Sequence, residues 1–242
     1  MCSYLFHFNW LTVKKRIEVN YLPGIKSFKD GDEIAEQLAG LERHPISVLN
    51  WPAFPYQPAA EFTIAYQDDK IFLKYDVAEK DIKSNYLVAN DPVYKDSCVE
   101  FFMAIGEDEK YYNLEFNCIG TCLAAYGTGR DEREFLPKHL IEKIQHRSFF
   151  TLKDGLVHWE LTLAIPLEVF CHHSLKTFRG LTGRANFYKC GDDLPDPHFL
   201  SWNPIQTEEP DFHQSAFFGD IAFIDGVKDN HSTEINLNKP SI

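Results

Sequence analysis

Two runs of alternating residues, Glu61 to Gln67 and Lys70 to Val77, are separated by only Asp68-Asp69. A turn-prone pair between two such runs predicts a β-hairpin, because successive side chains of a strand point to opposite faces of a sheet. The second arm places four apolar residues on one face: Ile71, Leu73, Tyr75 and Val77. The hairpin therefore indicates a fold that is based on β-sheet.

Three further segments have the same alternation: Ser97 to Ile105, Tyr111 to Ile119 and Val157 to Ile165. If the first two pair as neighbouring strands, their polar residues share one face of the sheet. That face would carry Glu100, Asn113, Glu115 and Asn117. Such a concentration of carboxylate and amide groups is unusual for a sheet surface.

Helical patterning is confined to short stretches. Asp30 and Glu33 have the spacing of a capping box, and the apolar residues that follow them fall on one helical face. Pro137 to Lys143 is a second short helical segment. Short strands with little helix predict an all-β fold, a two-sheet β-sandwich of jelly-roll type with one or two short peripheral helices.

The 242 residues fit one β-rich domain. We expect residues 1–16 to form an N-terminal extension, residues 17–225 a single domain, and residues 226–242 a polar tail. The first residues, MCSYLFHFNWLTV, lack a basic leader and a small-residue cleavage site, and they are too few to span a bilayer. Neither a signal peptide nor a transmembrane helix is therefore expected, and the cytoplasm is the default location.

The formal net charge of −12 disfavours two classes of partner. A negative surface repels the phosphate backbone of nucleic acids and the anionic surface of membranes. We therefore expect neither nucleic-acid binding nor membrane insertion. The charge leaves the oligomeric state open.

A long segment, Gly183 to Phe223, joins one predicted strand to the next and holds Phe199, Trp202 and Phe212 among several acidic residues. A loop of this length costs ordering entropy and usually persists because it builds a site. Aromatic rings with hydrogen-bonding groups around them suit a sugar, whose ring face is mostly C–H and whose rim carries hydroxyls. A mono- or oligosaccharide is therefore the expected partner.

Asp192, Asp193 and Asp196 cluster in the same segment and are candidates for a Ca²⁺ site. Their spacing is not that of an EF-hand, and a solvated acidic turn is the alternative. No other cofactor is indicated by the sequence.

Five segments in order resemble the family 9 carbohydrate-binding modules and family-9-like proteins. They are DSCVEFF at 96–102, YNLEFN at 112–117, WELTLAIP at 159–166, NFYKCGD at 186–192, and SWNP at 201–204 followed by Phe218-Gly219. The resemblance covers roughly Glu61 to Phe223. It implies a jelly-roll sandwich that holds the end of a glycan between two aromatic rings, without catalysis.

The resemblance also implies site residues. Tyr94 and Trp202 would be the two rings, although the first ring of the family is typically a tryptophan. The polar contacts that the resemblance implies are Glu100, Glu115, Asn117, Tyr188 and Lys189. Glu115 stands where the family has an arginine, which replaces a cation with an anion, and Arg130 or Lys189 could compensate.

Three alternatives stay open. Trp202 could be a ligand platform or a buried side chain beneath the long loop. Glu100 and Glu115 could be the acid and base of a divergent glycoside hydrolase, because that reaction needs two carboxyl groups with different pKa values. The domain could also be a β-sandwich that binds another protein.

Overall fold

The computed structural model describes residues 14–24, 28 and 31–225. Two short α-helices are seen there, α1 (Gly31–Ala39) and α2 (Lys138–Ile141). The strands are β1 (Arg16–Tyr21), β2 (His44–Pro45), β3 (Val48–Leu49), β4 (Ala59–Gln67), β5 (Lys70–Glu79), β6 (Cys98–Ile105), β7 (Tyr111–Asn117), β8 (Cys122–Gly127), β9 (Arg133–Phe135), β10 (Gln145–Lys153), β11 (Leu156–Pro166), β12 (Thr182–Cys190), β13 (Phe199–Ser201) and β14 (Gly219–Ile224). The predicted predominance of β-structure is confirmed.

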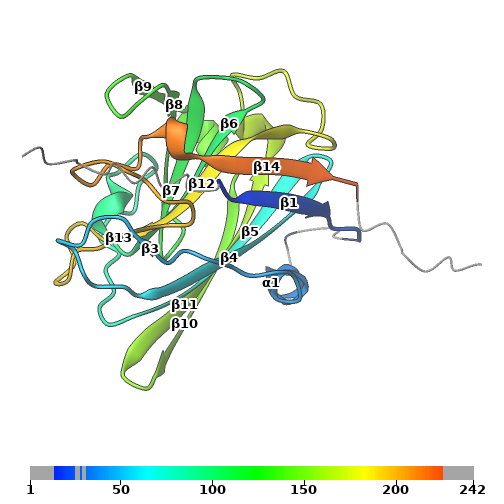
Figure 1. The fold of residues 1–242 in the computed structure, drawn as a ribbon. Helices are drawn as coiled ribbons and strands as arrows, with labels where there is room; N and C mark the ends of the chain where they lie inside the picture. Colours follow the sequence, from blue (N-terminus) through cyan, green and yellow to red (C-terminus); the bar gives the residue numbers. More distant parts are fainter. Residues whose placement is uncertain (1–13, 25–27, 29–30, 226–242) are drawn as a thin grey trace, which may run out of the picture.

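The strands are linked into one curled sheet (Figure 1). Its order is β10-β11-β5-β4-β1-β14-β12-β6-β7-β8-β9, with β2, β3 and β13 attached beside this path. The parallel pair β1–β14 joins the half that contains β4 and β5 to the half that contains β12 and β6. This continuity differs from the expected pair of separate sheets, since hydrogen bonds run from one half into the other.

The two halves nevertheless face each other across a core. Phe62 of β4 stacks on Phe187 of β12 with ring centroids 3.6 Å apart, although two strands separate β4 from β12 in the sheet. The inward residues of β5 and β6 lie in the same cluster, as their alternation predicted. Trp159 of β11 is also buried there. The sheet is therefore folded over on itself like a sandwich.

The predicted hairpin is formed by β4 and β5, with Gln67 opposite Lys70 across the Asp68-Asp69 turn. The predicted pairing of β6 with β7 is also formed, and Glu100 lies directly opposite Glu115. Both helices occur where patterning placed them. Ile34 and Leu38 of α1 pack on the outer face of the sheet against Phe72.

Some predicted segments lie outside the described residues. They are Asp30 of the capping box, the residues before 14 in the expected extension, and the whole of the expected tail. In the part of the chain that the structure describes, no helix has the length and apolar character needed to cross a bilayer.

A buried charged pair connects the two halves of the sheet. Lys189 Nζ of β12 lies 2.9 Å from Glu79 Oε2 of β5, and both side chains are fully buried. The contact is an ion pair and not a hydrogen bond, because the geometry at Oε2 does not meet the angles of a hydrogen bond. Trp159 Nε1 donates to Glu79 Oε1 at 2.7 Å. Lys189 also lies 2.8 Å from His198 Nε2, which brings the loop after β12 into the same network.

His198 is the neutral member of this network. Its Nδ1 lies 2.9 Å from the Asp196 carbonyl, which can only accept, so Nδ1 donates and Nε2 accepts from Lys189. Burial, and then the nearby Lys189 charge, lower the pKa of His198 to about 3. The buried charges are therefore those of Glu79 and Lys189.

Replacing Lys189 with methionine should lower the free energy of unfolding by about 3–5 kcal/mol, because it leaves the Glu79 carboxylate buried without its counter-charge. The double variant Lys189→Met/Glu79→Gln should recover part of this loss, since glutamine keeps an oxygen for Trp159. Urea unfolding measures both. Lys80→Met, at an exposed lysine that pairs with Asp196, is the matched control and should change little. A double variant no more stable than Lys189→Met would contradict the charge argument.

Candidate functional site

The polar face predicted from β6 and β7 forms the floor of a cavity of about 540 Å³. Glu100 and Glu115 lie on this floor as direct cross-strand partners, and they are only 3% and 2% exposed. Five residues predicted for binding or metal coordination line the cavity: Tyr94, Glu100, Glu115, Arg130 and Asp192. We call this space the acidic cavity.

Arg133 supplies a cation that the sequence did not assign to the site. It lies on β9, and its Nη1 donates to Glu115 Oε1 at 2.9 Å. Of the two residues expected to compensate for the missing family arginine, Arg130 pairs with Asp211 at 3.0 Å and Lys189 pairs with Glu79 in the core. Both arginines line the acidic cavity. The compensating charge at Glu115 thus comes from Arg133, three residues further along the chain on β9.

Glu115 has one satisfied and one free oxygen. Asn113 Nδ2 donates to Oε1 at 3.0 Å, beside the bond from Arg133. Among the described residues, Oε2 is buried and has no hydrogen-bond partner. A buried acceptor without a donor is costly, so Glu115 keeps one unmet acceptor behind the cavity surface.

Burial raises the pKa of several carboxyl groups of the cavity. Burial, and then the Glu115 charge, raise the pKa of Glu100 well above its usual value. Burial also raises the pKa of Glu115, although Arg133 opposes the shift. The pKa of Asp192 is raised to about 6, chiefly by burial and then by Glu115. A protonated carboxyl donates one hydrogen bond and accepts others, so the floor can match both roles of a hydroxyl.

His213 forms part of the wall and is neutral. Arg133 can only donate, so at 3.2 Å it donates to His213 Nε2, and the Nδ1 proton goes to Tyr111 Oη at 2.8 Å. Burial and the Arg133 charge lower the pKa of His213 to about 3. These bonds hold the ring, and with it the wall of the cavity, in one orientation.

Four aromatic rings line the acidic cavity: Tyr94, Phe135, Phe199 and Phe212. Tyr94 comes from the 3-10 helix η2 (Val93–Lys95), just before β6. Phe135 follows Arg133 by two residues on β9, so both side chains lie on one face of that strand. Phe135 is 59% exposed, which is unusual for a phenylalanine. An exposed ring at the cavity is available for stacking.

Trp202 is not at the acidic cavity, and its predicted role as a ligand platform is corrected here. It is 3% exposed and packs edge-on against Phe62 and Phe187 in the core, with ring centroids 6.2 and 5.8 Å away. The backbone N–H of Trp202 donates to the Phe187 carbonyl at 2.8 Å. The predicted clamp of Tyr94 and Trp202 is therefore not formed, and the buried alternative holds.

The loop-like neighbours of Trp202 explain its burial. Ser201 Oγ donates to the Asn203 carbonyl at 2.7 Å, and Asn203 N–H donates to Asn186 Oδ1 at 2.8 Å. These bonds satisfy buried backbone groups that would otherwise keep the segment at the surface. Polar residues that usually indicate an exposed loop here serve to anchor a buried one.

Three other predicted contacts are also absent from the cavity lining. Lys189 projects from the opposite face of β12 and pairs with Glu79. Tyr188 is stacked beneath Phe212, with ring centroids 4.1 Å apart, and is fully buried. Asn117 Nδ2 donates to Asp96 Oδ2 and to the Tyr86 carbonyl at 3.0 and 2.8 Å. Each side chain is therefore used within the protein.

The structure does not bring the three candidate calcium ligands together. Asp193 pairs with Lys83 and Asp196 with Lys80, whereas Asp192 lines the acidic cavity. Within the described ranges, the donor atoms that do meet are those of Cys98, Glu100 and Cys190. Calcium binding at the Asp192 turn remains a prediction.

Comparison with known proteins shows the family. The model of carbohydrate-binding family 9 matches residues 32–223. The chain therefore belongs to this family. No curated protein matches it.

Solved structures agree with this assignment. A candidate carbohydrate-binding protein from Bacteroides uniformis is 35% identical, with a TM-score of 0.80 over 87% of this chain and 100% of the other. A family 9 module from Caldicellulosiruptor kristjanssonii in complex with cellotriose is 17% identical, with a TM-score of 0.54 over 92% and 100%. A family 9 module from the same organism in complex with glucose is 15% identical, with a TM-score of 0.52 over 90% of this chain and 100% of the other. The last two likenesses show a shared fold.

Asp192→Asn should stabilise the protein at pH 7.5 and leave its stability nearly unchanged at pH 4. The folded-state pKa of about 6 exceeds the ordinary 3.8, so wild-type stability falls as the pH rises from about 4 to about 6. Partial exposure limits the effect to the order of 1 kcal/mol. Thermal unfolding across this pH range measures it. Asp193→Asn is the exposed control, and an equal gain at both pH values would contradict the assignment.

Proposed function

We propose that this protein binds a mono- or oligosaccharide in the acidic cavity without catalysis. The observation that carries the proposal is the pair of carboxyl side chains, Glu100 and Glu115, lining a cavity that also has exposed aromatic surface, in a chain of carbohydrate-binding family 9. Support also comes from the family 9 modules of similar fold, whose structures hold cellotriose and glucose. The cavity volume lies within the range of about 300–1,000 Å³ that is usual for small-molecule sites.

The polar floor would select the geometry of the sugar hydroxyls. Glu115 offers an acceptor that is strengthened by charge, and the neighbouring Arg133 fixes its orientation. Glu100 holds a proton more readily and can donate to a sugar oxygen. A hydroxyl both donates and accepts, so this pair of carboxyl groups can meet both needs.

The stacking surface would come from Tyr94 and Phe135. Tyr94 keeps the role predicted for it, because it lines the acidic cavity. Phe135 takes the role predicted for Trp202, because its exposed ring lines the same space. Each stacking contact adds about 1 kcal/mol beyond the buried area. A few such contacts give weak affinity, since ordering and desolvation consume most of the gross gain.

The placement of the two carboxyl groups favours binding over hydrolysis. A glycoside hydrolase holds its carboxyl groups on either side of the bond that breaks. Glu100 and Glu115 are instead direct partners on neighbouring strands and lie side by side on one floor. Side chains in this position approach a ligand from the same side.

Tyr94→Ala and Phe135→Ala should each weaken sugar binding about fivefold, the factor that corresponds to about 1 kcal/mol. Isothermal titration with glucose and cellotriose measures the dissociation constants. Phe150→Ala, at an exposed ring of β10 that does not line the cavity, is the matched control. Trp202→Phe should lower stability but leave affinity within twofold.

Two results would overturn the binding proposal, and a third would overturn the choice of the two rings. The absence of saturable binding at millimolar concentrations of any sugar on a glycan panel would favour the protein-binding alternative. Release of reducing sugar that disappears in Glu100→Gln would show a glycoside hydrolase. A loss of affinity in Trp202→Phe, without loss in Phe135→Ala, would show that Tyr94 and Trp202 are the stacking rings.

A further inference from the structure

Two thiols and a carboxyl group meet at the boundary of the acidic cavity. Cys98 and Glu100 are two residues apart on β6 and share one face of that strand. Cys190 of β12 is the direct cross-strand partner of Cys98, so its side chain joins them. The sulfur and oxygen atoms of the three residues lie within 4.8 Å of one another.

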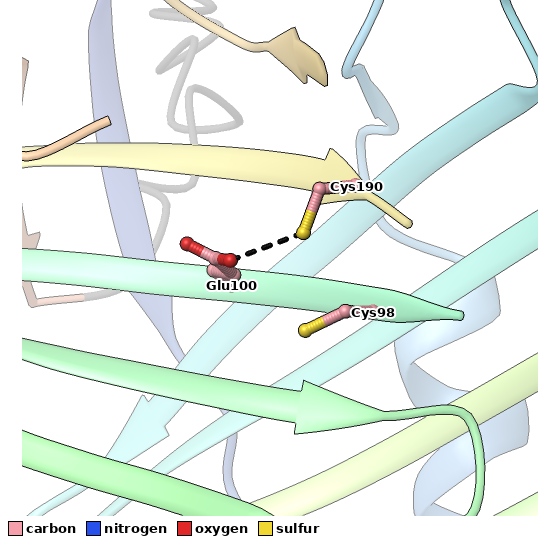
Figure 2. A group of neighbouring side chains, drawn as sticks. All are labelled: Cys98, Glu100 and Cys190. Carbon is pink, nitrogen blue, oxygen red and sulfur yellow. Dashed lines mark hydrogen bonds between the residues drawn. The ribbon is translucent and has the colours of Figure 1, made fainter. Parts of the chain in front are cut away.

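The donor atoms lie close together on neighbouring strands. Figure 2 shows Cys190 and Glu100 directed at each other from neighbouring strands, with Cys98 beside them on the strand of Glu100. Cys190 Sγ donates to Glu100 Oε1 at 3.2 Å. This separation is close to the distance between two ligands of one tetrahedral metal ion, for which metal–sulfur and metal–oxygen bonds are about 2.3 and 2.0 Å.

The cluster is closed on the protein side and open toward the cavity. All three residues are buried, whereas Glu100 and Cys190 also line the acidic cavity. Three protein ligands with one open position is the arrangement of zinc sites that hold a water molecule or another small ligand in the fourth position. The rigidity of the two paired strands would preserve it without a change of backbone.

Among the described residues Glu100 has no ion-pair partner of its own, although the charge of Arg133 opposes the rise of its pKa from a distance. Among the described residues, the hydrogen bond found for its carboxyl group is the one from Cys190. The nearest arginine bonds, from Arg133, go to Glu115 instead. A buried carboxyl group of this kind gains more from a bound cation than one already paired.

We propose that Cys98, Glu100 and Cys190 bind a thiophilic divalent cation such as Zn²⁺, with one coordination position facing the acidic cavity. Two sulfur ligands select zinc or a similar metal over Ca²⁺ and Mg²⁺, which prefer oxygen. Binding releases the thiol protons and any carboxyl proton to solvent, leaving two thiolates and a carboxylate around the ion. Glu100 Oε1 coordinates the ion, and Glu100 Oε2 stays free to accept a hydrogen bond from a molecule in the cavity. The proposal does not depend on sugar binding.

Cobalt titration without sugar tests the site. Protein with Cys171→Ser, which removes the thiol that is exposed among the described residues, is purified with a phosphine reductant and treated with a chelator. One equivalent of Co²⁺ should produce a sulfur-to-cobalt charge-transfer band, and Zn²⁺ should remove it. Cys98→Ala and Cys190→Ala should abolish the band, and Glu100→Gln should weaken binding at least tenfold. Cys118→Ala, at a buried cysteine outside the cluster, is the matched control.

X-ray absorption of the zinc-loaded parent protein tests the same ligands without a folding risk. The spectrum should show two sulfur neighbours at about 2.3 Å and oxygen at about 2.0 Å. Binding of less than one equivalent at micromolar metal, equal binding by Cys98→Ala and Cys118→Ala, or a zinc shell without sulfur would overturn the proposal. So would a Cys98–Cys190 disulfide in protein isolated without reductant, because it would consume both sulfur ligands.

Discussion

The buried ion pair between Glu79 and Lys189 is the interaction on which the arrangement of this molecule depends. It joins β5 in one half of the curled sheet to β12 in the other, and it is fully removed from water. Apolar contacts alone would tolerate a small slip of one half over the other, whereas a buried charge must meet its counter-charge. The bonds to Trp159 and His198 extend this requirement to β11 and to the loop after β12.

Strand β12 contributes to the core with one face and to the acidic cavity with the other. Lys189 points into the core, while Cys190 points to the acidic cavity. Anchoring one face of β12 thereby fixes the position of Cys190 against Glu100, and of the floor formed by β6 and β7. The site is thus a consequence of how the core is closed, with Arg133 and His213 completing it from the surrounding segments.

Residue alternation predicted much of this floor. A period of two assigns Glu100 and Glu115 to one face as soon as β6 and β7 are paired, and the structure places them directly opposite each other. The same rule placed Asn117 on this face, but it could not show that Asp96 and the Tyr86 carbonyl would use its amide. Nor could it choose between Arg130 and Arg133, because the charged residues 130–134 show no alternation that indicates which side chain points into the cavity.

The sequence by itself determined the class of fold, the hairpin, the pairing of β6 with β7, and the family, because these depend on local alternation and on ordered segments. Only the tertiary structure decided that the halves form one continuous sheet, that Phe135 is exposed at the cavity, and that Trp202 is buried. The physical reason is the bonding of Ser201, Asn203 and Asn186. These bonds satisfy buried polar groups, in part through contacts between segments that are distant in sequence. A local pattern of polar residues is the same whether their hydrogen-bond partners are protein groups or water, so the sequence alone does not show that the segment is buried.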